Sequence, residues 1–496
     1  MERGSLSAEH ALELELCLDP GDVRPLLRRF RAARGRTLSL KWHDTADGAL
    51  AGRGLAIIET RQARATLWRV ERIAPDAQAM WPCGTPAPTL QETPHRAALD
   101  GVVPKGPLHP LAEFRGRARE LTVPEAPQPR TTLLQGTLRA EARNQDVCRL
   151  AIAGAPPAVA ALAADLAQEF RLSVATATLS AEASVLAGRA PPDGPLGAPE
   201  LSTNLSVSDA FAFACAYLGR VIAHYAPLAA AGDGTEPVHQ MRVAMRRLRS
   251  ALALFHHMVA CAEFETAKAG LRVLGHALGP ARDWDVFVTE TGSAVAAAFP
   301  DDAAIARLAK AAARRRDGCY DELRRVLDGP AFRRLGITLA VLAAARPWRV
   351  ANEAALASGT NTPPETLEEF AARALSRRLR HLTSSGDDIA ALPDATLHTM
   401  RLRTKRLRYG VEMLAPLYPR REARRYLRRL TVLQERLGHF NDGAVAAALM
   451  NELGRTGGRS YAAGVVCGFV AARAGNARDR IAKTWHKFRR LHPFWT

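Results

Sequence analysis

The sequence has few of the residues and patterns that mark several classes of protein. Aromatic residues make up 6% of the 496 residues, and the seven cysteines lie far apart without a Cys-x-x-Cys pair. Such scattered cysteines indicate reduced thiols rather than a disulfide framework. No window approaches 18 apolar residues free of charge, and the N-terminus lacks the apolar run after a basic start that marks a secretory leader. We therefore expect a cytoplasmic protein that does not span a membrane.

Positive charge, by contrast, is in excess. The formal net charge is +18 and the isoelectric point is about 10.3. Residues 1–200 carry 24 basic and 23 acidic side chains, whereas residues 201–496 carry 44 and 27. Because nearly all of the excess lies in the second part of the chain, this part is predicted to bind an acidic partner such as nucleic acid, anionic lipid or polyphosphate.

Two kinds of sequence pattern divide the chain into domains. Up to about residue 155, short segments of alternating apolar and polar residues predict strands, and residues 156–170 predict a helix. From about residue 205 onward, long segments with a period of 3.6 residues predict roughly ten helices. The predicted fold class is an α+β domain over 1–182, built on an antiparallel barrel, then a Pro- and Gly-rich linker over 183–204 and an all-α duplicated helical bundle over 205–496.

An internal repeat is the most informative feature of the helical part. The segment VHQMRVAMRRLRSALALF at 238–255 matches LHTMRLRTKRLRYGVEML at 397–414. The segment LGPARDWDV at 278–286 matches LGHFNDGAV at 437–445 with the same offset of 159 residues. We therefore expect two copies of one helical unit, over about 205–350 and 363–496, packed with approximate two-fold symmetry.

Each copy of the repeated helix carries a basic edge beside an apolar face. Neither 239–249 nor 398–408 contains an acidic residue, so both lack the ion pairs four residues apart that support an exposed charged helix. A run of arginines can be a solvated helix face, but duplication at matched positions favours a binding site for a multivalent anion. Arginine suits phosphate because its planar guanidinium binds two oxygens at once. The two basic edges consist of His239, Arg242, Arg246, Arg249, His398, Arg401, Lys405 and Arg408.

Two other residue types in the repeats have alternative roles. His239 and His398 stand at the heads of the basic edges, where their ring N–H groups would bind phosphate best when protonated. Neither has a His, Cys or carboxylate partner at ligand spacing on its helix, so no metal site is predicted there.

Asp283 and Asp442 follow a Leu-Gly pair and precede an apolar run, which is the position of a helix N-cap. Alternatively, each carboxylate holds an arginine of the basic helix in its binding rotamer.

Residues 205–496 closely resemble the CHAD domain. The resemblance lies in the motifs VHxxRVxxRRLRSAL and LHxxRxRxKRLRY, in the two LGxxxD segments and in a closing FRRLHPFW. It implies a duplicated helical bundle whose basic central channel binds inorganic polyphosphate, and a protein that can associate with polyphosphate granules. It also implies that the eight residues of the basic edges contact the anion, with Lys483 and Lys487 as weaker candidates. No cofactor is expected for this function.

The first domain resembles the CYTH domain, also called a triphosphate tunnel domain, but departs from its pattern. The family's first strand reads ExExK, whereas this chain has Glu13, Glu15 and Cys17. The two arginines that follow Gly-Leu-Ala in the family are replaced by the segment 57–60, IIET, and the late acidic strand reads CRLAIA at 148–153. Triphosphate hydrolysis needs cations for the phosphates and several carboxylates for Mg²⁺ or Mn²⁺. We therefore expect a degenerate domain with no catalytic residues other than, at most, Glu13 and Glu15.

Three functions remain open on these grounds. Polyphosphate binding without catalysis accounts for the duplicated basic edges and for the charge imbalance. A metal-dependent inorganic triphosphatase would rest on Glu13 and Glu15. Binding to the phosphate backbone of nucleic acid would use the same arginines, although such modules commonly interleave cations with stacking aromatics, and here only Tyr409 lies at the end of the second edge. The sequence does not predict the oligomeric state.

Overall fold

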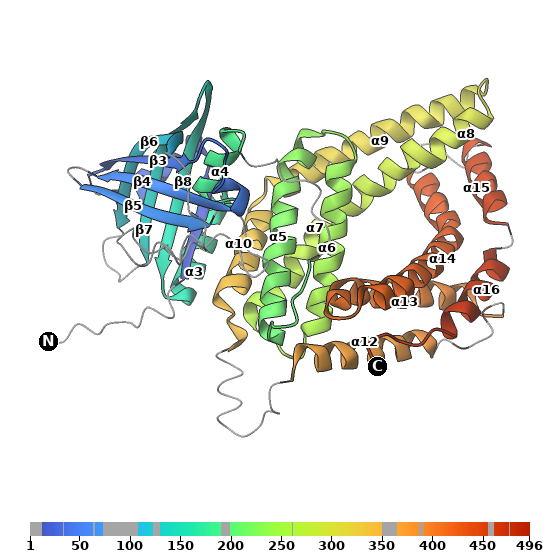
Figure 1. Cartoon of the computed structure of the whole chain (residues 1–496). Helices are drawn as coiled ribbons and strands as arrows, with labels where there is room; N and C mark the ends of the chain where they lie inside the picture. The colour runs from blue at the N-terminus through green and yellow to red at the C-terminus, as the bar shows by residue number, and fades with distance from the viewer. Residues whose placement is uncertain are drawn as a thin grey trace.

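The computed structural model describes residues 12–72, 108–122, 129–189, 199–349, 365–454 and 461–496, with short gaps at 33, 63–64, 260, 385, 387–388, 390 and 476. A strand-rich part is followed by a helical part (Figure 1). Among the helices described, none is long and apolar enough to cross a membrane.

The first part is an antiparallel sheet, as the alternating sequence segments predict. The strand order is β5-β4-β3-β6-β7-β8-β1-β9, and β2 pairs with β6. Among the described strands, β5 and β9 lie at the two ends of this order, so closure of the sheet into a barrel stays a prediction. The strands are β1 (Leu12–Leu18), β2 (Arg31–Ala32), β3 (Arg36–Asp44), β4 (Leu55–Gln62), β5 (Ala65–Arg72), β6 (His109–Thr122), β7 (Arg130–Ala140), β8 (Arg143–Gly154) and β9 (Leu172–Val174).

Helices accompany the sheet in the described residues of this part. They are α1 (Val23–Arg29), α3 (Pro156–Glu169) and α4 (Leu179–Leu186). Helix α3 coincides with the predicted helix at 156–170. Helix α4 begins with Thr178, whose side chain accepts a hydrogen bond from the amide of Ala181. Because α4 extends to Leu186, the first residues of the predicted linker 183–204 are helical, and residues 190–198 lie outside the described part.

The second part is helical throughout its described residues, as predicted. The basic edges predicted from the sequence lie on α6 and α13, which are the two matched segments of the repeat. The helices are α5 (Val207–Ala231), α6 (Glu236–Phe255), α7 (Ala262–Val286), α8 (Gly292–Ala298), α9 (Ala303–Leu327), α10 (Pro330–Ala345), α12 (Leu367–Thr383), α13 (Asp394–Leu414), α14 (Arg420–Gly454), α15 (Tyr461–Ala474) and α16 (Ala477–Arg489).

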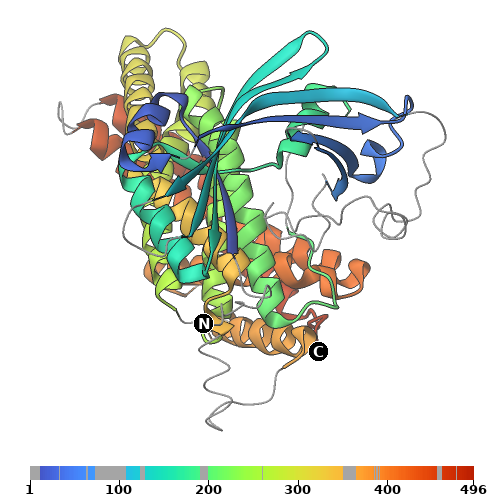
Figure 2. The same cartoon turned by 90° about the vertical axis from the view of Figure 1, so that its left-hand side faces the viewer.

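Helix α10 joins the two parts into one packed unit. It packs against α3 and β9 on one side and against α5 and α7 on the other. The Arg333 guanidinium on α10 donates to the carbonyl oxygen of Ala167 on α3 at 2.9 Å. A single cluster of buried apolar residues runs from β1 through α10 into the helical part, and the sheet lies directly beside the long helices (Figures 1 and 2). Removal of residues 1–204 would therefore expose apolar surface, so experiments are best done on the complete chain.

A close approach of two glycines fixes the middle of the sheet. Gly116 on β6 is paired with Gly136 on β7. The ring of Phe114 covers this pair, so that a Cβ added at Gly136 would lie 2.7 Å from its Cζ and would also overlap the backbone of Arg115 and Gly116. The buried Phe114 ring belongs to the smaller core that lies between the sheet and α4.

We expect Gly136→Ala to lower the free energy of unfolding by about 1–3 kcal/mol, because the added methyl group must displace either the Phe114 ring or a neighbouring strand. Gly52→Ala is a matched control, since a Cβ at Gly52 would have no described atom within 4 Å. Chemical denaturation of the two variants would measure the difference. Equal stabilities would contradict the proposed packing.

Candidate anion-binding site

The apolar faces of α6 and α13 orient their basic edges. Met241, Met245 and Leu248 on α6 are buried, as are Met400 and Leu407 on α13. The two helices pack against one another. The apolar residues recur every three or four positions and face the core. The basic side chains between them therefore lie at the rim of the contact between α6 and α13.

The structure brings the two basic edges together around Lys405. Burial lowers the pKa of Lys405 to about 7, and repulsion by Arg246, Arg401, Arg242 and Arg408 contributes in the same direction. Two of these arginines lie on α6 and two on α13, the helix of Lys405 itself. Burial also lowers the pKa of Arg246, and Arg242, Arg408 and Arg401 add to the effect. We call these five residues, Arg242, Arg246, Arg401, Lys405 and Arg408, the cation cluster.

An aromatic ring supports the centre of the cation cluster. The Arg246 guanidinium carbon lies 5.2 Å from the centre of the Tyr409 ring, and that of Arg408 lies 4.9 Å from it. Both distances are within the range of cation–π attraction. Tyr409 is only 8% exposed, so its ring serves as a platform beneath guanidinium groups contributed by both helices.

Carboxylates compensate part of the positive charge of the cation cluster. Asp283 on α7 lies 3.4 Å from the Arg242 guanidinium. Burial raises the pKa of Asp283, although Arg242, Lys405 and other nearby cations oppose the shift. Arg408 pairs with Glu412 one turn along α13, and its Nε donates to the side-chain oxygen of Gln434 at 2.8 Å.

The N-cap interpretation of Asp283 is wrong. Helix α7 continues through Gly279 and Pro280 to Val286, so Asp283 lies in its last turn. Burial of Leu278, Ala281 and Trp284 in the core outweighs the local cost of the glycine and the proline. The alternative, in which the carboxylate contacts an arginine of the basic helix, agrees with the Arg242–Asp283 contact. The side chain of Asp442 lies outside the described residues.

The remaining predicted residues lie at the edges of the cation cluster or away from it. His239 is half-buried, and burial lowers its pKa, with Arg282 as the next cause. His398 is exposed near the start of α13, and Arg249 is exposed on α6 beside Gly275 of α7. Lys483 and Lys487 are exposed on α16, which packs against α14. The described contacts join neither lysine to the cation cluster.

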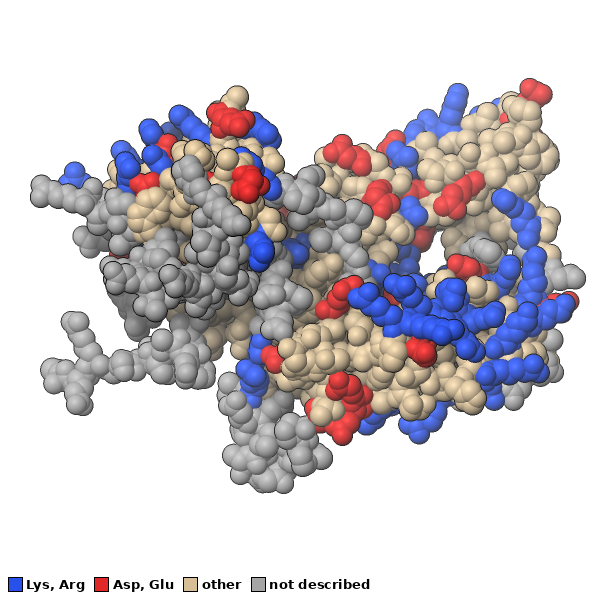
Figure 3. Space-filling model, viewed as in Figure 1, with Lys and Arg blue, Asp and Glu red and all other residues tan. Residues whose placement is uncertain are grey.

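Further cations surround the site in space. Figure 3 shows Lys and Arg side chains gathered over the region of α13, α14 and α16, next to an opening between the helices of the second part. The first three turns of α14 contribute exposed arginines to this surface, namely Arg420, Arg421, Arg424, Arg425, Arg428 and Arg429. The electrostatic potential near the cation cluster is therefore reinforced by the surface around it.

Comparison with known proteins decides the family of this helical part. Residues 212–451 match the model of the CHAD domain family. The chain contains a CHAD domain. The CHAD domain from the plant Ricinus communis is similar in structure, with 25% sequence identity and a TM-score of 0.51 over 61% of this chain and 98% of that chain. PptA from Streptomyces chartreusis shares 17% identity, with a TM-score of 0.44 over 57% of this chain and all of that chain. No curated protein sequence matches the chain.

Within the CHAD domain, Arg378 fixes the distance between the two basic helices. This residue of α12 donates to the Ser250 hydroxyl of α6 at 3.2 Å and to the Arg406 carbonyl oxygen of α13 at 2.8 Å. Burial lowers its pKa to about 10, with repulsion by Arg377 and Arg406 as further causes. The close approach of the Arg378 side chain to α13 requires Gly410, since a Cβ at Gly410 would lie 2.8 Å from a guanidinium nitrogen of Arg378. Sequence analysis missed this role, as it missed the Tyr409 platform, because each depends on a contact with a distant segment.

The N-terminal candidates Glu13 and Glu15 do not form a metal site. Glu15 accepts a hydrogen bond from the buried Arg149 at 2.5 Å, and the other guanidinium nitrogen lies 2.8 Å from Glu182 on α4. Glu13 is exposed. Within the part of the chain that the structure describes, no group of three or more His, Cys, Asp or Glu residues could hold a metal ion. The described residues around Glu13 and Glu15 therefore do not fit a bound Mg²⁺ or Mn²⁺.

The face of the sheet near Glu15 is also closed. The side chains of Leu40, Trp42, Phe114 and Leu138 form an apolar core with α4 on this side. The Trp42 indole donates to the Ser180 hydroxyl of α4 at 2.7 Å, which anchors the helix against the sheet. The resemblance to the CYTH domain stays a prediction, and the described face offers packed apolar side chains rather than a row of cations.

We expect Arg378→Met to lower the free energy of unfolding by about 1–3 kcal/mol, because hydrogen bonds to α6 and α13 are lost. The change should also move α13 away from α6 and raise the pKa of Lys405 above about 7, toward the ordinary value of about 10.4. Titration of ¹³C-methylated lysines by NMR would measure this pKa. Arg377→Met is the control, and an unchanged Lys405 pKa in Arg378→Met would show that Arg378 does not set the spacing.

Proposed function

We propose that the CHAD domain of this chain binds inorganic polyphosphate at the cation cluster between α6 and α13. The observation that carries the proposal is that the guanidinium groups of Arg246 on α6 and Arg408 on α13 lie over the same Tyr409 ring. The pKa of Lys405 is lowered to about 7, first by burial and then by repulsion from these and the other arginines of the cation cluster. Such mutual repulsion raises the free energy of the unliganded protein. A multivalent anion that lies along the rim of the two helices would offset it.

The chemistry of the cations suits a chain of phosphates. Four of the five members of the cation cluster are arginines, whose planar fork binds two phosphate oxygens at once. Polyphosphate carries closely spaced negative charges along its whole length. The exposed arginines on the first turns of α14 extend the positive surface beyond the cluster, so that an extended anion can contact both.

Nucleic-acid binding is less well supported, because the aromatic ring in the cluster is not available to a base. Tyr409 is 8% exposed, with the guanidinium groups of Arg246 and Arg408 over its ring. Proteins that bind single-stranded nucleic acid commonly stack bases on exposed aromatics. The cation cluster thus offers contacts to phosphate but no stacking surface among its described residues.

The proposed function is binding without turnover. The Glu15 carboxylate is neutralised by Arg149, and the described residues around it do not fit a divalent metal. No cofactor is then required. A cytoplasmic protein with this activity would be expected on polyphosphate granules, where its ligand is concentrated.

Reversal of two charges in the cluster should abolish binding of the complete chain to immobilised polyphosphate. Arg246→Glu with Lys405→Glu is expected to weaken the dissociation constant about 100-fold or more, since each change removes a charge-assisted contact and adds a repulsive one. Arg24→Glu with Arg28→Glu on α1 is the control, because it changes the net charge equally at exposed positions of the first domain. Equal losses in the two double variants would indicate nonspecific attraction and contradict the proposed site.

Two further measurements complete this test. Circular dichroism of the variants would show that they remain folded, and Lys405→Met supplies a milder change should the glutamates unfold the protein. Competition with duplex DNA at matched phosphate concentration separates the two anions. If DNA competed for the protein as effectively as free polyphosphate does, nucleic acid rather than polyphosphate would be the better candidate.

Polyphosphate affinity should fall as the pH rises from 7 to 9. In the free protein the pKa of Lys405 is about 7, below its ordinary value, whereas a bound polyanion would raise it. Binding therefore takes up a proton in this range, and the affinity declines by at most about tenfold per pH unit. Calorimetry with long chains, in two buffers of different ionisation enthalpy, would count the protons. Lys405→Arg should bind without this uptake, and a wild-type affinity that is constant over the range would contradict the coupling.

A further inference from the structure

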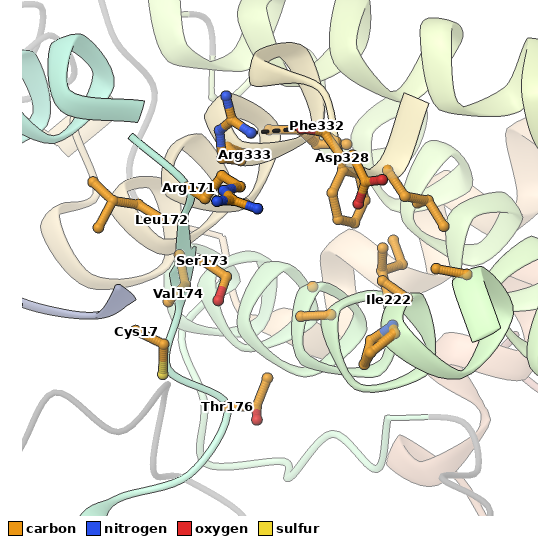
Figure 4. Close-up of a pocket in the computed structure, with 18 of the residues that line it drawn as sticks. Cys17, Arg171, Leu172, Ser173, Val174, Thr176, Ile222, Asp328, Phe332 and Arg333 are labelled. Atoms are coloured by element: carbon orange, nitrogen blue, oxygen red, sulfur yellow. Dashed lines mark hydrogen bonds between the residues drawn. The ribbon is translucent and has the colours of Figure 1, made fainter. Parts of the chain in front are cut away.

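A cavity of about 610 Å³ lies where the sheet meets the helical part (Figure 4). Its walls are β9, the end of β1, one face of α5 and the first turns of α10. From these walls we infer a binding site for a small amphipathic acid, that is, a molecule with an apolar body and one carboxylate. The cavity is within the size range of sites for small organic ligands. It shares no residue with the cation cluster, so the inference goes beyond polyphosphate binding.

The side walls suit an apolar body. Helix α5 presents small residues at intervals of three or four positions, which places them on one face, and this spacing leaves room in front of the helix. On the opposite side, Gly336 of α10 lines the cavity together with Leu335 and Leu339. The small residues of α5 that line the cavity are Gly219, Ala223, Ala226 and Ala230.

One end of the cavity suits an anion. Arg171 and Arg333 lie side by side there (Figure 4). The Arg333 guanidinium donates to the carbonyl oxygens of Ala167 at 2.9 Å and Asp328 at 2.5 Å, which are neutral acceptors. Burial lowers its pKa, as does Arg171, while Asp22 and Asp328 act in the opposite direction. In the described part of the chain, no carboxylate lies within ion-pair distance of Arg333, which leaves its charge for a ligand.

Asp328 also lines this end of the cavity, whereas Arg171, Asp19 and Asp22 are engaged with one another. Arg171 lies 3.6 Å from the carboxylates of both Asp19 and Asp22. Asp19 also accepts the amide of Gly21 at 2.8 Å, and Asp22 accepts the amide of Arg171 at 2.7 Å. The half-buried Arg333 is thus the cation that a bound carboxylate would pair with, and the apolar body would lie along α5.

Polyphosphate does not fit this cavity, because it has no apolar part to cover the α5 and α10 walls. A ligand with an apolar body would contact β9 of the first part together with α5 and α10. It would therefore stabilise the junction between the two parts of the chain, since a ligand that binds only the assembled junction shifts its equilibrium toward that state.

The test is calorimetric titration of the complete chain with decanoate, kept below its micelle concentration. We expect saturable binding at one site per chain. Butyrate retains the carboxylate but little of the apolar body, and 1-decanol retains the body without the charge. Each should bind at least about tenfold more weakly than decanoate. If decanol bound as tightly as decanoate, the role of Arg333 would be overturned. If decanoate did not bind at all, the whole inference would be overturned.

Two variants tie the binding to this cavity. Gly336→Leu should fill it and weaken decanoate binding by about tenfold or more, since a Cβ at Gly336 would meet Val174 at an ordinary 3.7 Å and the rest of the side chain would enter the open space. Ala331→Leu, exposed on the same helix, is the matched control and should bind normally. Arg333→Gln should reduce decanoate binding toward that of decanol. Retained decanoate affinity in Gly336→Leu would place the ligand elsewhere, and polyphosphate binding should be unaltered in all three variants.

Discussion

Mutual repulsion between the cations of α6 and α13 is the constraint on which the helical domain depends. Burial lowers the pKa of Lys405 to about 7, and repulsion by arginines from both helices acts in the same direction. The buried apolar faces of the two helices hold them together against this repulsion, at roughly 25 cal/mol for each Å² removed from water. Arg378 adds hydrogen bonds to both helices from α12. The fold therefore keeps the cations at a spacing that they would not adopt by themselves.

In the first domain, by contrast with α6 and α13, a buried cation is neutralised by carboxylates. Arg149 is 3% exposed and lies between the carboxylates of Glu15 and Glu182, so its charge is compensated within the protein. Removing one partner of such a group would leave an unpaired buried charge, which is strongly destabilising. An internal ion pair of this kind stabilises a structure but leaves no charge for a ligand. The contrast explains why the same residue types form a candidate site in one domain and a closed core in the other.

The two domains are nevertheless one packed body. Helix α10 is buried between α3 and β9 on one side and α5 and α7 on the other, and the apolar core continues across it. The small residues of α5 and Gly336 of α10 leave a cavity at this junction. The first domain thus has a structural role, because it covers helices of the CHAD domain that would otherwise expose apolar surface to water.

The sequence by itself determined the helices, most strands and the basic edges, because hydrophobic periodicity is a local property of each segment. It also contains the matched segments 238–255 and 397–414, from which we expect the cations of α6 and α13 to act together. Only the tertiary structure decided which cations meet. It places Arg242 and Arg246 with Arg401, Lys405 and Arg408, but not Lys483 or Lys487. It also extends α7 through Asp283, against the local signal of Gly279 and Pro280, because burial of the helix in the core outweighs local preference. The Tyr409 platform, the Arg378 contacts and the pairing of Glu15 with Arg149 join residues far apart in the chain, and their energies exist only once those segments have packed.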